Sequence, residues 1–428
     1  MSARGELFTY VGLDVTDTTL TARFDLDGRK FTEVATFEGV GALTEPAPRA
    51  VATLWYLLAG LSYYKSGAAR RVDLASTPIT PSGRALLGAA LHDGLAEFAY
   101  RNEITLDDVA IDGGVDAPTP PVALDAHRVL TPFGGGIDSV VTACELKGRV
   151  DQALFIVSPA SGRFTPLEET AQTTGLPIVR VARSLDPQLL GDDPTLLHGH
   201  VPVTAMITLL ASTAAVASGR GGVVMSNEHS ASSPNLRRNG ADVNHQWSKS
   251  WLAEQLIADA VDEAFDGELV VASYLRDRSE LWVAAVFSHL TEFHHVFRSC
   301  NRAFTQSNER RASAWCGECD KCLFINLVLA PFLPRATLRE IFAGEPLSDP
   351  ARAEQLRTLV GLGAQHKPFE CVGDPDESAV ALAQVSALGE WADVTRLDEL
   401  AQLISPDRDF ADLLTPQGPS RVPAHWLR

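Results

Sequence analysis

The sequence predicts an α/β protein: a doubly wound parallel sheet, an N-terminal α+β domain and a helical C-terminal part that carries a cysteine cluster. Apolar strands alternate with helices between residues 129 and 225, residues 7–40 alternate apolar and polar side chains, and the pattern after residue 254 is mostly helical. Strands that alternate with helices pair in parallel through right-handed crossovers. A chain of 428 residues is also too long for one ordinary domain of about 100–200 residues.

The N-terminal domain begins with short antiparallel strands over residues 7–40. Leu20–Phe24 has the clearest alternation of apolar and polar side chains, and Asp27-Gly28 forms a turn. Two helices are predicted next, over residues 51–65 and 82–100. The segment that follows is rich in Gly, Pro and Asp, which is typical of a linker, and it separates this domain from the next.

The second domain alternates strands and helices. Its predicted elements are a strand over 129–133, a helix over 139–147, a strand over 153–157, a helix over 167–174, a strand over 177–181, a helix over 203–217 and a strand over 222–225. We therefore expect three domains: an N-terminal α+β domain over 1–120, an α/β domain over 121–298, and a cysteine-rich and helical region over 299–428.

The charge balance opposes one large class of function. The chain has 36 Lys and Arg against 54 Asp and Glu, a formal net charge of −18. Non-specific nucleic-acid binding depends on basic side chains that neutralise phosphates, so the acidic excess opposes it. No charged segment followed by an apolar segment opens the chain, and no apolar run approaches about 18 residues. We expect a cytoplasmic protein that binds neither nucleic acid nor a membrane.

Three consecutive glycines, Gly134, Gly135 and Gly136, join the first strand of the α/β domain to its helix. Glycines let the backbone approach a ligand closely, and the N–H groups at a helix N-terminus bind anions. Ser139 adds a hydroxyl donor, and Asp138 orients the loop or helps to hold Mg²⁺. The loop has neither the Gly-Lys-Ser/Thr of a Walker A motif nor the G-x-G-x-x-G spacing of a dinucleotide site. The alternative is a tight turn built of glycines for packing alone.

Four cysteines lie within a short stretch: Cys300, Cys316, Cys319 and Cys322. Clustered thiols in a chain of this length indicate metal chemistry more often than disulfides. Thiolates at two-residue gaps suit tetrahedral Zn²⁺, and four protein ligands would make the site structural. An iron–sulfur cluster is the competing interpretation, and a set of buried reduced cysteines is a third.

The glycine loop resembles the S-G-G-x-D-S loop of the PP-loop ATP pyrophosphatases, which have a HUP-like fold, with Gly134 in place of the first serine. Enzymes of that superfamily bind the β,γ-pyrophosphate of ATP, adenylate an acceptor oxygen and release pyrophosphate. The resemblance implies that the adenine lies near Ser158, at the end of the second strand. The Cys-Gly-Glu-Cys-Asp-Lys-Cys run over 316–322 is similar to the zinc site of the 7-cyano-7-deazaguanine synthases, which are PP-loop enzymes.

Six further strings resemble the UDP-N-acetylmuramoyl-L-alanyl-L-glutamate epimerase family (MurL). They are Ser62–Lys65, Glu97–Tyr100, His198–Thr204, Ser226–Ser230, Val243–Ser250 and Lys367–Gly373. The resemblance covers about residues 50 to 380, most of the chain. Ile137 stands where the glycine loop of the family is expected to carry a lysine, which implies weaker ATP binding if that lysine contacts phosphate.

The resemblance implies an ATP-dependent epimerisation of the terminal L-glutamate of UDP-N-acetylmuramoyl-L-alanyl-L-glutamate to D-glutamate, for peptidoglycan synthesis. A free carboxylate disfavours a second negative charge on the neighbouring carbon, and adenylation removes that obstacle. A base then takes the α-proton, an acid returns one to the opposite face, and hydrolysis of the acyl-adenylate releases AMP. The expected cofactors are ATP, Mg²⁺ and a structural Zn²⁺, and the expected partner is the muramyl-dipeptide, with functional coupling to an L-glutamate-adding muramyl ligase.

Several polar residues are candidates for the ATP site. Asn227 and Glu228 follow a predicted strand, at the carboxyl end where open α/β sheets bind ligands. We interpret Glu228 as a Mg²⁺ ligand or an ATP-site residue, the alternative being a solvated loop acid. Lys249 is placed to hold the pyrophosphate or the UDP phosphates, the alternative being an ordinary surface lysine.

Cys371 is the candidate α-carbon base. Amino-acid epimerases of other folds that need no cofactor use a pair of thiols, and Cys371 lies outside the cluster, whereas Cys144 falls in an apolar helix. A histidine is its expected partner, and His200 and His245 are the further catalytic candidates. The alternative for a histidine that precedes an apolar helix, as His200 does, is a cap or core residue.

Two rival functions stay open at this point. One is a nucleobase-processing PP-loop enzyme, such as a 7-cyano-7-deazaguanine synthase or a tRNA thiolation enzyme, and the net charge of −18 disfavours the latter. The other is a regulatory nucleotide-binding subunit without catalysis, which the presence of Asp138, Ser139, Asn227 and Glu228 disfavours. Release of pyrophosphate from ATP would separate the enzymes from the regulatory subunit.

Overall fold

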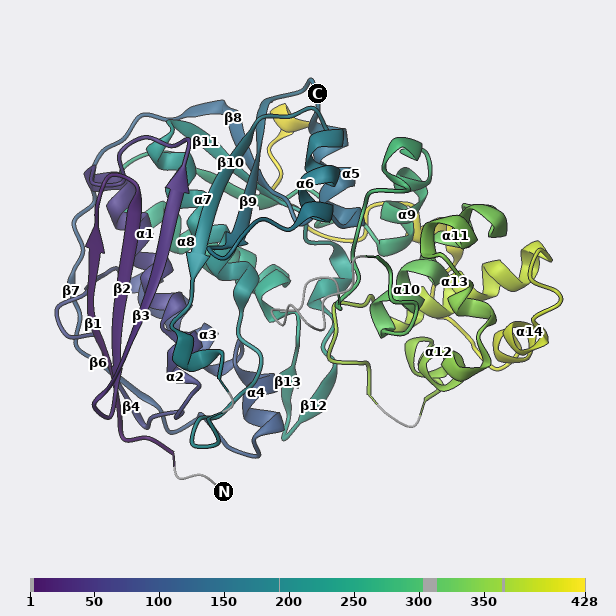
Figure 1. Ribbon diagram of the computed structural model, residues 1–428, viewed down its shortest axis with the longest axis horizontal. Coiled ribbons are helices and arrows are strands. Elements are labelled where there is room, and N and C mark those ends of the chain that lie inside the picture. Colours follow the sequence, from purple (N-terminus) through teal and green to yellow (C-terminus); the bar gives the residue numbers. More distant parts are fainter. Residues whose placement is uncertain (1–3, 192, 303–313, 364–365, 428) are drawn as a thin grey trace.

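A ten-stranded sheet forms one side of the molecule, and the helices of the C-terminal part gather on the other (Figure 1). The computed structural model describes residues 4–191, 193–302, 314–363 and 366–427. The strands lie in the order β14-β11-β8-β9-β10-β3-β2-β1-β4-β6. Among the described residues, no helix has both the length and the apolar character needed to span a membrane.

The first three N-terminal strands form an antiparallel meander, and two later short strands of this part join the same sheet in parallel. The elements of this part are β1 (Leu7–Val15), β2 (Thr19–Leu26), β3 (Arg29–Glu38), α1 (Pro46–Ala59), α2 (Leu61–Tyr64), β4 (Arg71–Asp73), β5 (Pro78–Ile79), α3 (Pro81–His92), α4 (Ala96–Arg101), β6 (Ala110–Asp112) and β7 (Val115–Asp116). Strand β2 buries every second side chain, which explains its alternating pattern. Asp27 and Gly28 both have positive φ, so the predicted turn between β2 and β3 is confirmed.

The next part alternates strands and helices as predicted. Its elements are β8 (Asp125–Pro132), α5 (Ile137–Leu146), β9 (Asp151–Pro159), α6 (Thr165–Thr173), β10 (Ile178–Ser184), α7 (Val203–Ala217), β11 (Arg220–Met225), β12 (Leu236–Arg238), β13 (Ala241–Val243), η3 (Trp247–Lys249), α8 (Trp251–Ala264) and β14 (Val270–Ser273). Adjacent residues of one strand face different cores: Val129 lies with α5 and α9, and Leu130 lies with α7 and α8. Helices therefore cover both faces of this part of the sheet.

Five strands form the parallel sheet that the sequence predicts for the α/β part, but the ten-stranded sheet that contains them is mixed. Strands β14, β11, β8, β9 and β10 are parallel, but β10 pairs with β3 in antiparallel register, with Val181 opposite Phe37. The N-terminal meander thus covers an edge of β10 that would otherwise be unpaired. The sheet and the larger core run across residue 120 without interruption, and the domain boundaries at 120 and 298 stay predictions.

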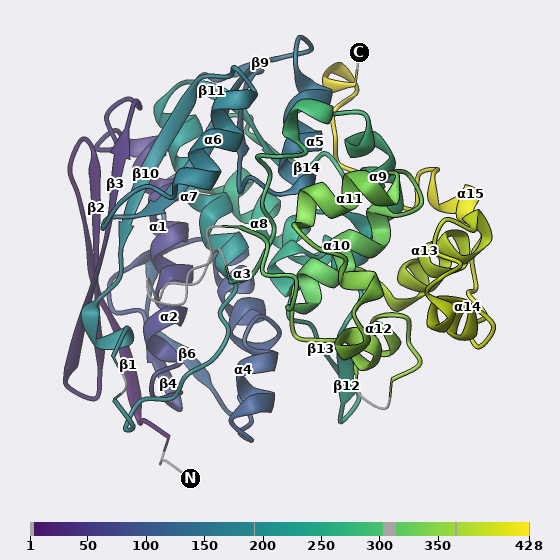
Figure 2. The same cartoon turned by 45° about the vertical axis from the view of Figure 1, so that its right-hand side comes forward.

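The C-terminal part is helical. Its helices are α9 (Glu280–Ser288), α10 (Asp320–Leu329), α11 (Arg335–Phe342), α12 (Ala353–Leu359), α13 (Pro375–Leu388), α14 (Thr395–Ala401) and α15 (Phe410–Leu413), and they pack around α10 and α13 (Figure 2). The sequence pattern after residue 254 did not reveal strand β14 (Val270–Ser273), because a four-residue apolar run is too short to distinguish from a helix segment.

The order of the parallel strands identifies a binding edge. The chain runs from β8 outward through β9 and β10, and then returns to the other side of β8 to form β11 and β14. The order therefore reverses between β8 and β11. In open α/β sheets, ligands bind at the carboxyl ends of the two strands that flank such a reversal.

Candidate active site

The glycine loop follows β8 at this reversal point. Gly135 has φ +73°, and its carbonyl accepts a 2.9 Å hydrogen bond from the backbone N–H of Arg298. A Cβ on Gly136 would lie 2.6 Å from Ser299 Oγ, so a larger residue would force the Ser299 side chain to move. Gly136 is the N-cap of α5, and Ser139 Oγ donates to its carbonyl at 3.0 Å. The loop is therefore held on both sides, and the N-terminus of α5 lies at the binding edge.

Two carboxylates meet beside the loop. Asp138 lies in the first turn of α5, and Glu228 follows β11 with 2% of its surface exposed. Burial, and then the negative charge of Glu228, raises the pKa of Asp138 to about 6. Among the described residues, the buried Oδ1 of Asp138 has no hydrogen-bond partner. A pair of buried acids of this kind favours a cation between them.

The end of β11 is anchored to β14 and to a buried arginine. Asn227 Nδ2 donates to Ser273 Oγ at 3.0 Å, and Arg276 donates to the Glu228 carbonyl at 3.0 Å. Arg276 is also paired with Glu254 at 2.8 Å, and it donates to the Lys249 carbonyl at 2.7 Å. This network fixes the backbones of Asn227, Glu228 and Lys249 at the edge of the sheet.

Lys249 connects the acids to a thiol. Burial lowers the pKa of Lys249, but the negative charges of Cys371 and Glu228 outweigh that effect and raise the pKa. The same contact acts on the thiol: burial raises the pKa of Cys371, and the charges of Lys249 and His245 outweigh it and lower the pKa to about 6. Cys371 is thus a thiolate at neutral pH.

His245 lies between Cys371 and an acid from the N-terminal part. Its Nδ1 lies 2.5 Å from Oε2 of Glu97, and the side chains of Glu97 and His245 are 5% and 16% exposed. Burial lowers the pKa of His245, but the hydrogen bonds to Cys371 and Glu97 raise it to about 9. At neutral pH the site therefore holds a thiolate beside an imidazolium.

His200 is the neighbour of His245 and has the opposite charge state. The two rings lie 4.2 Å apart between their centres. Burial, and then the charge of His245, lowers the pKa of His200 to about 4, so this ring is neutral. A Cβ on Gly199 would lie 2.9 Å from the Phe98 ring, so a glycine is needed for this loop to pack against α4.

Ser158 lies at the carboxyl end of β9, in register with Ala182 of β10. It is at the same edge of the sheet as the glycine loop, because β9 is parallel to β8. The structure therefore brings together Asp138, Glu228, Lys249, His245, Cys371 and His200, and places Ser158 two strands from β11.

Sequence reasoning missed several charged residues of the site: Glu97, Glu280, Lys321, Lys367 and Glu377. Lys321, within the cysteine run, acts on both Glu228 and Cys371. Burial raises the pKa of Glu377 to about 8 and raises that of Glu280 well above its usual value. Glu97 and Lys367 lie inside strings that already carried the family resemblance, which was the available signal.

The four cysteines come together as predicted. Cys300, Cys316, Cys319 and Cys322 have sulfurs that all lie within 4.8 Å of one another. Cys322 Sγ lies 3.7 Å from that of Cys316 and 3.4 Å from that of Cys319. Tetrahedral Zn²⁺ with bonds of about 2.3 Å needs sulfurs about 3.8 Å apart, so the donor set and its spacing fit zinc. Lys321 lies between two of these cysteines, so the cluster also positions an active-site cation.

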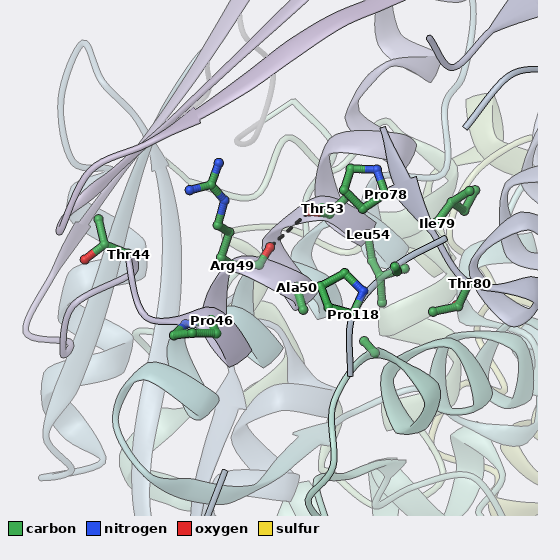
Figure 3. A pocket seen from close by; sticks show the side chains of 12 residues that line it. Thr44, Pro46, Arg49, Ala50, Thr53, Leu54, Pro78, Ile79, Thr80 and Pro118 are labelled. Atoms are coloured by element: carbon green, nitrogen blue, oxygen red, sulfur yellow. Dashed lines mark hydrogen bonds between the residues drawn. The ribbon is translucent and has the colours of Figure 1, made fainter. Parts of the chain in front are cut away.

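The most apolar of the described cavities lies elsewhere. It has a volume of about 280 Å³ and shares no residue with the site above. Figure 3 shows that side chains of α1, β5 and their neighbouring loops form its wall. The lining residues are Thr44, Pro46, Arg49, Ala50, Thr53, Leu54, Pro78, Ile79, Thr80, Ala117, Pro118 and Ala264.

Comparison with known proteins decides the family. A sequence model of the MurL N-terminal domain matches residues 2–274, and one of the MurL C-terminal domain matches residues 296–412. The chain belongs to the MurL family. Both MurL domains contribute to the site, because Glu97 and His245 lie in the first match and Cys371 lies in the second. No solved structure matches the chain significantly.

MurL relatives match along nearly the full length. A protein of Salinispora tropica named UDP-N-acetyl-alpha-D-muramoyl-L-alanyl-L-glutamate epimerase is 37% identical over 99% of this chain and 95% of its own. Proteins of the same name from a Micromonospora species and from Xanthomonas oryzae pv. oryzae are 35% and 34% identical, over 99% and 96% of this chain and 98% and 93% of their own. The predicted resemblance to this family is confirmed.

Proposed function

We propose that this chain is an ATP-dependent epimerase that converts the terminal L-glutamate of UDP-N-acetylmuramoyl-L-alanyl-L-glutamate to D-glutamate. The names of its full-length relatives support the substrate. One observation of the site carries the proposal: Lys249 interacts with the Asp138–Glu228 acids and with the Cys371 thiolate at once. An activation site and a proton-transfer site therefore lie beside each other.

The glycine loop and its acids suit carboxylate activation. An oxygen of the glutamate α-carboxylate attacks the α-phosphorus of ATP, a P–O bond forms, and pyrophosphate leaves. The N-terminus of α5 and Ser139 would hold the phosphates, and Asp138 and Glu228 would hold Mg²⁺. The metal would neutralise the charge of the leaving pyrophosphate. Formation of the acyl-adenylate, a mixed anhydride, removes the carboxylate charge that opposes loss of the α-proton.

The Cys371 thiolate is the proposed α-carbon base. Its pKa of about 6 means that it is ionised at neutral pH and ready to accept the proton. The His245 imidazolium is hydrogen-bonded to Cys371, stabilises the thiolate and keeps its own ring proton. Lys249, next to the thiol, would stabilise the negative charge that develops on the carbonyl oxygen of the activated glutamate.

The proton returned to the opposite face of the α-carbon must come from another group. Cys371 and His245 are neighbours, so we expect both to lie on one side of that carbon. The product of such a reaction carries a solvent proton at the α-carbon. Water then hydrolyses the acyl-adenylate, and the D-glutamate product and AMP leave. In peptidoglycan precursor synthesis, this reaction would follow that of a ligase that adds L-glutamate to the muramyl peptide.

The test is an incubation of the protein with UDP-N-acetylmuramoyl-L-alanyl-L-glutamate, ATP and Mg²⁺ in D₂O. The product is hydrolysed, its glutamate is separated on a chiral column, and AMP and pyrophosphate are assayed. We expect deuterated D-glutamate only when ATP is present, with AMP and pyrophosphate released. AMP release without D-glutamate would leave an adenylating enzyme and refute the epimerase. D-Glutamate without ATP would refute the activation step.

A further inference from the structure

The structure brings a carboxylate from helix α4 to the far side of the His245 ring. Glu97 Oε2 lies 2.5 Å from His245 Nδ1, and the Glu97 side chain is 5% exposed. Its other oxygen, Oε1, accepts a 2.6 Å hydrogen bond from Arg101 Nε, one turn further along α4. Both oxygens of the acid thus accept hydrogen bonds from potentially charged donors, which fixes the direction of the carboxylate.

The segments that carry His245 and Cys371 are joined by buried amides. The backbone N–H of His245 donates to Asn235 Oδ1 at 2.7 Å, and Asn235 Nδ2 donates to the Pro368 carbonyl at 2.6 Å. Gln246 Nε2 donates to the Val372 carbonyl at 3.0 Å. These bonds hold the histidine and thiol segments in a fixed relation on both sides of Cys371.

Helix α4 also packs against the segment that carries Cys371. The Arg101 guanidinium lies 4.8 Å from the centre of the Phe369 ring, and the Tyr100 ring lies 5.7 Å from it. Strand β13, just before His245, lies beside the same helix in Figures 1 and 2. One short helix of the N-terminal part therefore contacts His245 directly and also packs against the segment that carries Cys371.

We propose that Glu97 is a positioning residue of the active site: it fixes the orientation of His245 and stabilises its imidazolium, so that Cys371 stays a thiolate. The three side chains then form an acid–histidine–thiol line in which Nδ1 of His245 faces Glu97. This inference rests on the proposed function for its catalytic meaning, but the ionisation of Cys371 is measurable without any substrate.

Other charged side chains lie near Glu97, His245 and Cys371 and influence their ionisation. They are Arg101 and His200 on Glu97, Glu370 and His200 near His245, and Lys249, Lys321 and Lys367 near Cys371. Glu97 and Cys371 are the two groups that raise the pKa of His245 most. Loss of the acid should therefore lower the pKa of the histidine and raise that of the thiol.

The donor atoms of Glu97, His200 and His245 lie within 4.8 Å of one another, so the group also has the spacing of a metal site. The hydrogen bonds favour positioning, because Arg101 and His245 already use both oxygens of the acid. Metal analysis of the purified protein separates the two readings. We expect the same metal content in the natural protein and in Glu97→Gln.

The test is the pH dependence of alkylation of Cys371 by iodoacetamide, followed by mass spectrometry of the Cys371 peptide. We expect a midpoint near pH 6 in the natural protein and a rise of about one pH unit or more in Glu97→Gln. Glu103→Gln, an exposed acid close to the same helix, is the matched control and should keep the natural midpoint. A merely structural role of Glu97 would not move this midpoint in a folded variant.

A second variant guards against misfolding. His245→Gln should raise the midpoint at least as far, and Glu97→Gln should add nothing in that background. Independent, additive shifts, an unchanged midpoint in folded Glu97→Gln, or a metal ion lost with Glu97 would each overturn the proposal. If the midpoint moves while no D-glutamate forms in any protein, the proposed function fails and the positioning role stands.

Discussion

The two ends of the site hold their buried charges in opposite ways. At the glycine loop, Asp138 and Glu228 bring like charges together, and the pKa of Asp138 rises to about 6. At the thiol, Cys371 and His245 bring opposite charges together, and each stabilises the ionised form of the other. The first end places two neighbouring acids near Lys249 and Lys321 and suits Mg²⁺ and phosphates, whereas the second pairs one anion with one cation. Lys249 faces both. The contrast suggests that activation and proton transfer can be disabled separately.

Cys371→Ser should have the largest effect on epimerisation. A serine is not ionised at neutral pH, so the base is lost, and D-glutamate formation should fall by about 1,000-fold or more. ATP–pyrophosphate exchange in the presence of the dipeptide substrate should stay within about threefold of the natural rate, because the loop and its acids are unchanged. Chiral analysis and exchange of labelled pyrophosphate measure the two activities.

The control for this variant is Cys144→Ser, which removes a half-buried thiol in the last turn of α5, at the opposite end of that helix from Asp138. It should keep both activities. Normal epimerisation in Cys371→Ser would rule out the thiolate as the base.

Asp138→Asn should break the other end. The variant removes one of the two acids that suit Mg²⁺, so ATP–pyrophosphate exchange and D-glutamate formation should fall together, by about 100-fold. Alkylation of Cys371 should keep its midpoint near pH 6, because Lys249 and His245 remain. Glu169→Gln, an exposed acid of α6, is the control. An equal loss of thiol ionisation in Asp138→Asn would mean that the two ends are one coupled unit.

Lys249→Met should affect both ends, each by a smaller factor. Without its charge, ATP–pyrophosphate exchange should fall by about tenfold, and the alkylation midpoint of Cys371 should rise. The two readouts are measured on one preparation, alongside Lys147→Met as a control on a lysine outside the site. If only the exchange rate or only the alkylation midpoint changes, Lys249 acts at one end of the site and does not link the two.

The smallest expected effect is on the pH dependence of the epimerisation rate of the natural protein. Epimerisation should rise as the pH increases through about 6, since the Cys371 thiol and the Asp138 carboxyl both lose a proton there. The epimerisation rate should fall above about pH 9, because His245 becomes neutral there and no longer stabilises and positions the Cys371 thiolate. Rates measured from pH 5 to 10 would show a bell shape.

His245→Gln sharpens that profile. The rising limb of epimerisation should move to higher pH as the thiol loses its partner. The rising limb of ATP–pyrophosphate exchange should stay near pH 6, because Asp138 is unaffected. If the rising limbs of both pH profiles moved together, ATP activation and proton transfer would depend on the same ionising group, which would contradict the contrast drawn above.

The features that could be predicted are those with a local signal. Gly134 to Ser139 form a loop whose composition alone indicates close backbone approach, and the cysteines of the 316–322 run are spaced for one metal. The strands and helices between residues 129 and 225 were likewise confirmed, because periodicity within a short window reports which faces are buried. Strand pairing is different: nothing in β3 or β10 alone indicates that they lie side by side.

The sequence by itself determined the family, the loop that suits an anion, the cysteine cluster and most of the secondary structure. Only the tertiary structure joined the N-terminal meander to the parallel strands and brought Glu97, His245 and Cys371 into one line. Glu97 and His245 are 148 residues apart, and their contact depends on how α4 packs. Short motifs encode local backbone geometry, whereas the charge state of Cys371 depends on burial and on the groups that folding places around it.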